Sequence, residues 1–326
     1  MNILLAINKN IPVYQYGGSE RIVWWLGKAL HKMGHKVTFL AHIQQQCDFA
    51  RCIQYQPDVS FNQQIPNDIE MVHLHFIPAE MPQKPYIITM HGNTNHKQTF
   101  DQNTVYVSQD HAKRHHATCY VYNGIDTDDY SPVQLHNKRK HFHFLAKAAW
   151  RKKNIKGAIK IAKQTQTPLE VIGGTRLNFN MGFRFTLDFN SHFHGMLGGI
   201  EKDQIMQPSR GLLFPVIWPE PFGIALIESL YFGCPVFATP YGSLTELIHQ
   251  DVGFLSTSSS KTIEHIKNDY HYQPQHCHEY VGDQFTAQQM AANYLSLYEK
   301  SINKIKLNSE APYYTPEQDE KNYTFT

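Results

Sequence analysis

The feature that most constrains the fold is a repeated alternation between short apolar runs and longer amphipathic segments. In the first part of the chain, strand-like runs at 2–7 and 36–41 enclose a helical segment that has Ser19 as its N-cap, runs to about Met33 and is terminated by Gly34. Strand, helix and strand in this order are typical of parallel sheets with right-handed crossovers. The other strands predicted in this part are 71–75, 86–90, 104–107 and 119–122.

The alternation is interrupted by a polar stretch at 127–140, which contains Pro132 and the basic run 138–140, and then begins again. An interruption of this composition between two periodic regions indicates a linker between domains. The strands predicted after it are 142–146, 169–172, 211–214 and 235–238, and the helices are 154–166, 224–232, 243–249 and 285–300.

The chain is therefore predicted to be an α/β protein with two doubly wound, Rossmann-like domains that face each other across a cleft. Its length of 326 residues also favours two domains. The predicted parts are an N-terminal domain at 1–126, a linker at 127–140, a C-terminal domain at 141–284, a helix at 285–304 and a polar, frayed tail at 305–326.

The composition excludes several classes of protein. Hydrophobic residues make up 41% and charged residues 18% of the chain, which allows a buried core and argues against disorder. The net charge of +2 gives no field that favours nucleic acid as a partner. Apolar runs such as 22–26 are far shorter than the about 20 residues of a membrane-spanning helix. The absence of a signal-peptide pattern and of any Cys-x-x-Cys pair favours a reduced, cytoplasmic protein.

A first candidate binding loop is Gly17-Gly18-Ser19-Glu20, between the first strand and the first helix. In a doubly wound sheet, ligands bind beyond the carboxyl ends of the strands, where helix N-termini present N–H groups to anions. Two glycines allow the backbone to approach a phosphate closely, although a double glycine is also an ordinary turn.

A second and more specific candidate is the loop at 215–223 with the helix that follows it. Glu220 lies between two prolines, which stiffen the backbone, and Glu228 lies in an apolar helix that Gly223 opens. A carboxylate in such a helix is costly unless it is paired or hydrogen-bonded. The two acids are either ordinary surface groups or ligands for hydroxyl-rich groups beside a phosphate, and the framing prolines favour the second interpretation.

These segments resemble the signatures of the retaining glycosyltransferases of family 4, which have the GT-B fold. The resemblance extends over nearly the whole chain, and its pieces occur in the order of the family. Besides Gly17–Arg21 and the Glu-x7-Glu region at 220–228, the similar pieces are 72–75, 89–92, 122–126, 194–195, 240–248 and 253–255.

The resemblance implies a role for each matching residue. It implies that the backbone N–H of Gly18 lies near the donor diphosphate and that His91 lies beside the anomeric centre. It further implies that Glu220 binds hydroxyls of the donor sugar and that Glu228 holds the ribose of the nucleotide. The implied donor-binding residues are Gly17, Gly18, Phe222, Gly223, Ile224 and Glu228, and the implied catalytic residues are His91, Glu220, Lys147 and Lys153.

The family also uses an Arg and a Lys after the first strand of the C-terminal domain to neutralise the leaving diphosphate. Here Lys147 stands at the position of the Arg, which replaces a bidentate fork by a point charge. Arg151, Lys152 and Lys153 compete for the second position. Lys153 is favoured because it immediately precedes the following helix, while a solvated basic loop is the alternative.

The implied activity is transfer of a sugar from a UDP- or GDP-linked donor to a saccharide or lipid-linked acceptor in the synthesis of a cell-envelope polysaccharide or lipopolysaccharide. Basic side chains and a helix N-terminus can neutralise a leaving diphosphate without Mg²⁺. We therefore expect metal-independent transfer with retention and no cofactor besides the nucleotide-sugar co-substrate. The family also implies an acceptor-side N-terminal domain, a nucleotide-sugar-binding C-terminal domain, and a last helix that crosses back onto the former.

Two other functions stay open. One is a non-catalytic paralogue that binds a nucleotide sugar, although intact Gly18, His91, Glu220 and Glu228 argue against it. The other is a different GT-B enzyme, such as a nucleotide-sugar epimerase. Release of free UDP or GDP only when an acceptor is present separates transfer from both.

Histidines and tryptophans offer further interpretations. His111 with His115, and the run 276–278, lack a convincing third and fourth ligand, so no metal site is predicted. Trp24 and Trp25 are compatible with a half-buried helix or with peripheral docking at the inner face of a membrane. His73 and His75 lie on one face of a strand, as packing residues or as supports of the site.

Overall fold

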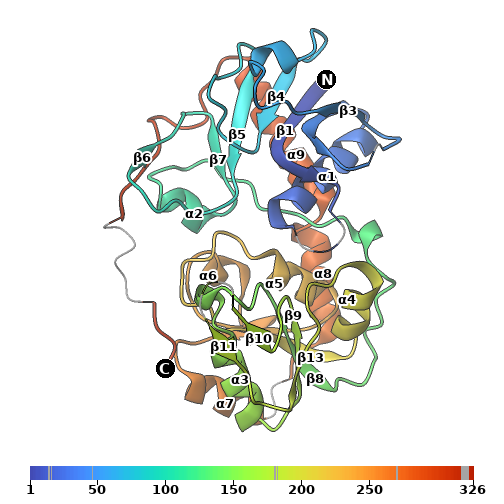
Figure 1. Ribbon diagram of the computed structural model, residues 1–326, viewed down its shortest axis with the longest axis vertical. Helices are drawn as coiled ribbons and strands as arrows, with labels where there is room; N and C mark the ends of the chain where they lie inside the picture. The colour runs from blue at the N-terminus through green and yellow to red at the C-terminus, as the bar shows by residue number, and fades with distance from the viewer. Residues whose placement is uncertain are drawn as a thin grey trace. The chain divides into compact units, whose positions relative to one another are not determined.

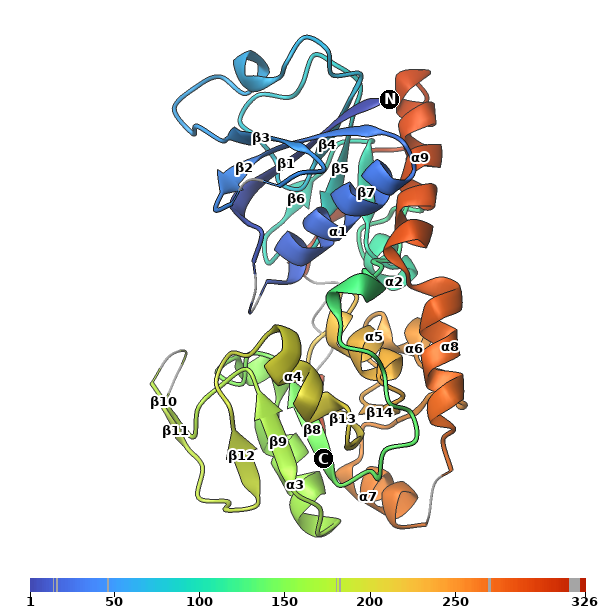
Figure 2. The same ribbon diagram turned by 90° about the vertical axis from the view of Figure 1, so that its right-hand side faces the viewer.

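The computed structural model describes residues 1–326 except 14, 16, 46, 180, 182, 269–270 and 317–322. The chain divides into two compact units, which Figure 1 and Figure 2 show. Among the described residues, unit 1 contains 1–13, 17–126 and 285–316, and unit 2 contains 127–284 and 323–326. Each unit is described separately below.

Unit 1 is built on a six-stranded sheet in which every neighbouring pair is parallel. The strand order is β3-β2-β1-β4-β5-β7. The order reverses between β1 and β4, which is the switch point of a doubly wound sheet. The strands are β1 (Asn2–Ile11), β2 (Lys36–Ile43), β3 (Arg51–Gln54), β4 (Met71–Leu74), β5 (Tyr86–Met90) and β7 (Thr104–Tyr106).

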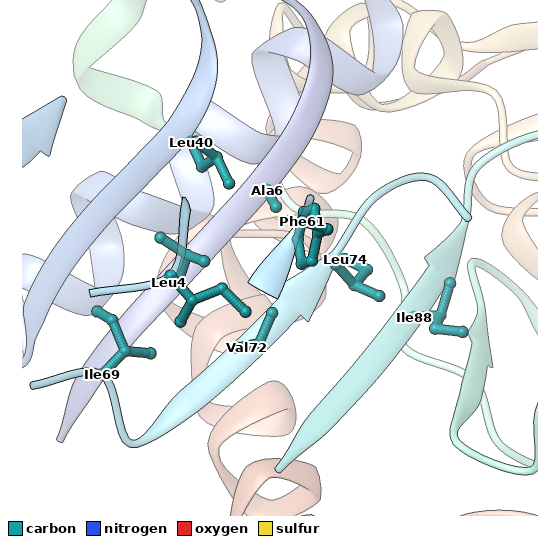
Figure 3. Close-up of a cluster of buried hydrophobic side chains, with 9 residues drawn as sticks. Leu4, Ala6, Leu40, Phe61, Ile69, Val72, Leu74 and Ile88 are labelled. Carbon is teal, nitrogen blue, oxygen red and sulfur yellow. The ribbon is translucent and has the colours of Figure 1, made fainter. Parts of the chain in front are cut away.

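Apolar side chains from the central strands form a core on one face of this sheet. Leu4 of β1, Leu74 of β4 and Ile88 of β5 pack there with Phe61, and Figure 3 shows how these side chains gather. The helical elements of unit 1 are α1 (Gly18–Lys32), η1 (Asn62–Gln64), α2 (Gln109–Lys113) and α9 (Ala287–Ile302).

Helix α1 buries its apolar stripe in unit 1, and this decides between the two interpretations of its tryptophans. Trp25 is 1% exposed. Trp24 stacks on Phe39 and meets Phe49 edge to face. Both indoles therefore serve packing within unit 1. No described helix is long and apolar enough to cross a membrane.

Helix α9 follows unit 2 in sequence and packs on unit 1. It contacts α1 and β5, and its Tyr294 and Tyr298 are fully buried. Their hydroxyl groups are satisfied by hydrogen bonds to Thr89 and His73. Buried polar groups need such partners, so these bonds fix the helix in register on the sheet.

Unit 2 repeats the architecture of unit 1. Its six strands are also all parallel, in the order β12-β9-β8-β13-β14-β15, with the switch point between β8 and β13. The predicted α/β class with two doubly wound sheets is confirmed. The strands are β8 (His141–Leu145), β9 (Leu169–Ile172), β12 (Ser191–Phe193), β13 (Ser209–Phe214), β14 (Val236–Ala238) and β15 (Gly253–Leu255).

The rest of unit 2 contains an antiparallel hairpin, β10 (Leu177–Asn178) with β11 (Arg184–Phe185), which is absent from the predicted strands. Residues 127–140 are mostly irregular and are held on unit 2, for example by the Ser131 N–H that donates to Asp203. The helical elements are η2 (Thr127–Asp129), η3 (Arg151–Lys153), α3 (Ile155–Gln164), α4 (Gly199–Met206), α5 (Ile224–Tyr231), α6 (Leu244–Leu247), α7 (Ser259–Lys267) and α8 (Pro274–Gln284).

Two predictions differ from the structure. Residues 119–122 form a single bridge between Tyr120 and Tyr106 instead of a strand. The described part of the tail expected to fray is packed, because Asn308 is buried and donates to the carbonyls of Gln102 and Thr104. Beyond it, β16 (Tyr313–Tyr314) pairs with β6 (Gln98–Thr99).

Candidate functional site

The carboxyl edge of the unit 2 sheet brings two predicted site residues into direct contact. The loop after β8 carries Lys153, and the loop after β13 carries Glu220. The two strands flank the switch point, where the loops of a doubly wound sheet diverge and leave room for a ligand. Lys153 Nζ donates to Glu220 Oε2 at 2.5 Å.

The Lys153–Glu220 pair is enclosed by aromatic rings. Trp218 Nε1 donates to the same carboxylate oxygen at 2.8 Å. The Lys153 ammonium lies 4.9 Å from the centre of the Trp218 ring and 5.1 Å from that of Phe214. The side chains of Lys153 and Glu220 are only 9% and 8% exposed. A pair this buried needs good geometry and extra hydrogen bonds to offset its desolvation, and Trp218 supplies one.

The other cations of this loop are arranged differently. Lys147, which follows β8, and Arg151 and Lys152 of η3 are all exposed to solvent. Lys152 contacts the site through the face of Trp218, 5.7 Å from the ring centre. Of the three residues that compete for the second cation position, Lys153 is the one that is buried and donates to the Glu220 carboxylate.

The backbone around Glu220 is fixed by the segment 240–243, which the sequence analysis singles out without assigning it a role. Ser243 donates to the carbonyls of Glu220 and Phe222, from its N–H and its hydroxyl respectively. Gly242 has a φ of +66°, and a Cβ atom added at this position would lie 2.4 Å from the backbone of Glu220. Only glycine allows this approach, so this turn holds Glu220 in position.

Asn154 ties the two loops together and yields a prediction. It caps α3 by accepting from the Gly157 N–H at 3.1 Å, and its amide donates to the Pro215 carbonyl at 2.8 Å. We expect Asn154→Ala to lower the free energy of unfolding by about 1–2 kcal/mol, the usual cost of losing a cap. Urea denaturation measures this, with the exposed Gln164→Ala at the end of α3 as control. Equal stability of the two variants contradicts the bridging role.

Glu228 lies on α5, whose N-cap is Gly223 with a φ of +89°. The carboxylate is buried, and its Oε1 accepts from Lys202 of α4 and from the Tyr130 hydroxyl at 2.9 Å. The sequence analysis predicts Glu228 and misses both partners. No motif marks Lys202, because its role depends on α4 being placed beside α5.

The sheet of unit 1 places the remaining predicted residues at its own carboxyl edge. Gly17 and Gly18 follow β1, and Gly18 is the first residue of α1. A Cβ atom added to Gly17 would lie 2.5 Å from the side chain of Val13, so the turn needs glycine there. A Cβ atom added to Gly18 would meet nothing within 4 Å, so there is open space beside its backbone.

His91 follows β5 and shares a hydrogen bond with His75, from Nε2 to Nδ1 at 2.9 Å. Desolvation, reinforced by Lys9, lowers the pKa of His91 to about 3. Desolvation also holds the pKa of His75 well below its usual range. Both imidazoles are therefore neutral near pH 7, and one donates to the other. His75 is thus a support of His91, whereas His73 packs between Thr89 and Tyr298.

Carboxylates and histidines do not gather into a cation site in the part of the chain that the structure describes. No group of three or more His, Cys, Asp or Glu side chains there is arranged to hold a metal ion. The sequence does contain an Asp-x-Asp triplet at 126–128, but Asp126 is buried and paired with Lys28 at 2.5 Å.

Residues 126–276 match the family model described as glycosyl transferases group 1. This range contains Lys153, Glu220 and Glu228 with the loops that hold them. The matched domain belongs to that family. The prediction of a glycosyltransferase enzyme is therefore confirmed, while the role of each site residue stays a prediction. No curated protein sequence matches this chain significantly.

Solved structures of glycosyltransferases resemble the whole chain in fold. AviGT4, a glycosyltransferase involved in avilamycin A biosynthesis, has a TM-score of 0.74 at 16% identity, covering 93% of this chain and 98% of its own. Anabaena HepE, solved with UDP and glucose, has a TM-score of 0.63 at 16% identity, covering 92% and 100%. WaaG, involved in lipopolysaccharide biosynthesis, has a TM-score of 0.55 at 15% identity, covering 93% and 99%.

Proposed function

We propose that this glycosyltransferase moves a sugar from a nucleotide-diphosphate donor to a saccharide or lipid-linked acceptor, without a metal ion and with retention of configuration. The observation that carries the proposal is the buried Lys153–Glu220 pair with Trp218 at the switch point of unit 2. A cation, a carboxylate and an aromatic face at one strand edge are the groups that a phosphorylated sugar requires.

The charge distribution of the reaction assigns the roles in unit 2. Breaking the bond between sugar and phosphate places negative charge on the diphosphate, so cations and N–H donors are needed where it leaves. Lys153 and Lys147 supply the cations, and the first turn at Phe222, Gly223 and Ile224 supplies N–H groups, since the first amides of a helix have no intrahelical acceptor. Glu220 accepts from hydroxyl groups of the donor sugar.

Glu228 holds the ribose in this proposal, and its partners define how. Oε1 already accepts from Lys202 and Tyr130, and these two bonds orient the carboxylate within the apolar surroundings of α5. In the proposed complex the carboxylate also accepts from the vicinal hydroxyl groups of the ribose. HepE, solved with UDP and with UDP-glucose, supports a uridine nucleotide as the first donor to test.

Residues of unit 1 act on the reacting sugar. Gly18 offers its backbone N–H at the start of α1, where the helix dipole favours negative charge. His91 is neutral and held by His75, so it contributes a hydrogen bond to a sugar hydroxyl and no net charge. Retention follows if the acceptor attacks the face from which the diphosphate departs, assisted by that phosphate.

The acceptor belongs to cell-envelope polysaccharide or lipopolysaccharide synthesis in this proposal, carried out in the cytoplasm with peripheral contact at the membrane. WaaG supports this assignment through its fold and its described role. A lipid-linked acceptor is compatible with a chain that works at the inner face of the membrane without spanning it.

Thermal shift with UDP-, GDP- and ADP-sugars in the presence of EDTA tests the donor site. We expect one nucleotide class to stabilise the wild-type protein, by about 2.7 kcal/mol at a donor concentration of about 100 times the dissociation constant. Glu228→Ala is expected to lose this stabilisation, whereas Glu264→Ala, on the exposed face of α7, keeps it.

Product analysis then tests transfer itself. Free nucleotide diphosphate is expected only when both donor and acceptor are present. Stabilisation without turnover identifies a non-catalytic binding protein, and conversion of the donor sugar without acceptor identifies an epimerase. A protein that no nucleotide sugar stabilises, or that needs Mg²⁺ for turnover, contradicts the proposal.

A further inference from the structure

A continuous apolar face covers the hairpin of β10 and β11 in unit 2. Seven large side chains alternate along 177–189, and all are exposed, between 45% and 85%. Leu177 is the register partner of Phe185, and the rings of Phe179 and Phe183 lie 5.8 Å apart. The members of this hairpin face are Leu177, Phe179, Met181, Phe183, Phe185, Leu187 and Phe189.

On the other side of the hairpin, polar residues fix it in this orientation. Asn178 and Thr186 are buried. The Arg176 guanidinium donates to the carbonyls of Thr186, Asp188 and Ser191. A hairpin with its polar side inward and its apolar side in water reverses the usual pattern, and a slip by one residue exchanges the two sides. The hydrogen bonds of Arg176 prevent that slip.

The extent of the hairpin face exceeds what a free surface normally carries. At about 200 Å² for each fully exposed large side chain, it presents about 800 Å² of apolar surface. The largest apolar patch of a typical monomer is about 300–600 Å². An area of about 800 Å² is the amount that each partner buries in a protein–protein interface of standard size.

The chemistry of the face distinguishes between a protein and a lipid surface as its partner. It contains no Lys, Trp or Tyr, the residues typical of membrane-interface elements. The nearest cations face inward, since Arg176 binds three carbonyls and Arg184 donates to the Thr186 hydroxyl and the Thr175 carbonyl. An uncharged face with four Phe and one Met among its seven residues, in contrast, matches the core of a protein interface.

We propose that the hairpin face is the interface between two copies of this chain. An uncharged apolar strip can meet its own copy about a two-fold axis, because no charge is desolvated and no like charges are opposed. The two hairpins then pack face to face like two layers of a β-sandwich. This proposal does not depend on the donor, acceptor or mechanism of the transferase.

Sedimentation velocity from about 1 to about 100 µM tests the proposal, because standard-size interfaces have dissociation constants up to the micromolar range. We expect a dimer for the wild type and a monomer for Phe183→Glu/Phe189→Glu, with the dissociation constant raised at least about 100-fold. Both side chains are exposed, so the variant folds, as circular dichroism verifies. The matched control is Ile77→Glu/Ile305→Glu, which changes two exposed apolar residues of unit 1 and is expected to stay dimeric.

Three results overturn the proposal. The first is a wild-type protein that is monomeric over the whole concentration range. The second is a hairpin variant that dimerises as tightly as the wild type. The third is flotation of the monomeric wild type, but not of the variant, with vesicles of phosphatidylcholine and phosphatidylglycerol, which assigns the face to lipid.

Discussion

Replacing Lys153 by methionine is expected to lower the free energy of unfolding of unit 2 by about 3–5 kcal/mol and to abolish transfer. The substitution keeps an unbranched side chain that is one heavy atom shorter, and it removes the ammonium group that donates to Glu220. The carboxylate is then left buried, with the hydrogen bond from the Trp218 indole but without its cation. Urea denaturation monitored by circular dichroism measures the loss.

The double variant Lys153→Met/Glu220→Gln separates stability from catalysis. It removes both charges, and the glutamine oxygen still accepts from Trp218. We expect it to recover most of the lost stability, because replacing both partners of a buried pair is far less costly than removing one. We expect no recovery of transfer, since the cation and the carboxylate that act on the donor are both absent.

The neighbouring Lys152→Met provides the control for charge alone. Lys152 is exposed, so its removal is expected to change stability by at most about 0.5 kcal/mol. If Lys153→Met is as stable as the double variant, the buried pair is not closed in solution. If the double variant transfers sugar at the wild-type rate, Lys153 and Glu220 have no catalytic role.

Mild acid is expected to destabilise unit 1 by about 4–5 kcal/mol between about pH 7 and pH 5.5, and unit 2 much less. Desolvation holds the pKa of several histidines far below the ordinary value, a larger shift than that of His35, His141 or His265. In unit 2 this group contains His143, with a pKa of about 3. In unit 1 it contains His73, His75, His91 and His111.

The sign of the effect follows from proton uptake. Below about pH 6.5 the unfolded chain binds a proton at each of these histidines, whereas the folded chain does not until far lower pH. Each histidine therefore lowers the free energy of unfolding by about 1 kcal/mol between about pH 7 and pH 5.5, and this loss grows as the pH falls further. Four of these five strongly shifted histidines belong to unit 1, so unit 1 is expected to unfold before unit 2 as the pH falls.

The four tryptophans make the experiment possible, because Trp24 and Trp25 belong to unit 1 and Trp150 and Trp218 to unit 2. Urea denaturation followed by fluorescence in Trp24→Phe/Trp25→Phe reports unit 2, and in Trp150→Phe/Trp218→Phe it reports unit 1. Introducing His111→Gln is expected to reduce the pH dependence of unit 1 by about 1 kcal/mol. The exposed His96→Gln serves as control. Equal acid sensitivity of the two units contradicts the prediction.

The regular elements that could be predicted from the sequence are those with strong periodicity. The strand predicted at 169–172 coincides with β9, and the helix predicted with Ser19 as its N-cap agrees with α1, whose N-cap is Gly17, to within two residues. These segments carry enough apolar residues to identify their own buried face. The hairpin of β10 and β11 was missed although apolar residues alternate strictly along 177–189, which is a signal for strands; what the alternation could not indicate is that the apolar side faces water.

The candidate site divides in the same way. Glu220, Glu228 and the glycines at 17–18 could be identified because prolines, glycines and acids in apolar surroundings leave a local signal. Lys202, Tyr130 and His75 could not, since each functions through a residue that is distant in sequence. Lys153 could be predicted in part. The run of basic residues marked its loop in the sequence, and only its burial in the structure distinguishes it from Arg151 and Lys152.

By itself, the sequence determined the α/β class, the division into two doubly wound sheets and the loops at their carboxyl edges. Local periodicity and turn residues are sufficient for that, because they act over one or two turns of chain. The tertiary structure decided which charges meet: Lys153 with Glu220, and Lys202 with Glu228. The physical reason is that the energy of a buried ion pair depends on distance and desolvation, and both are set only when separate strands and helices pack together.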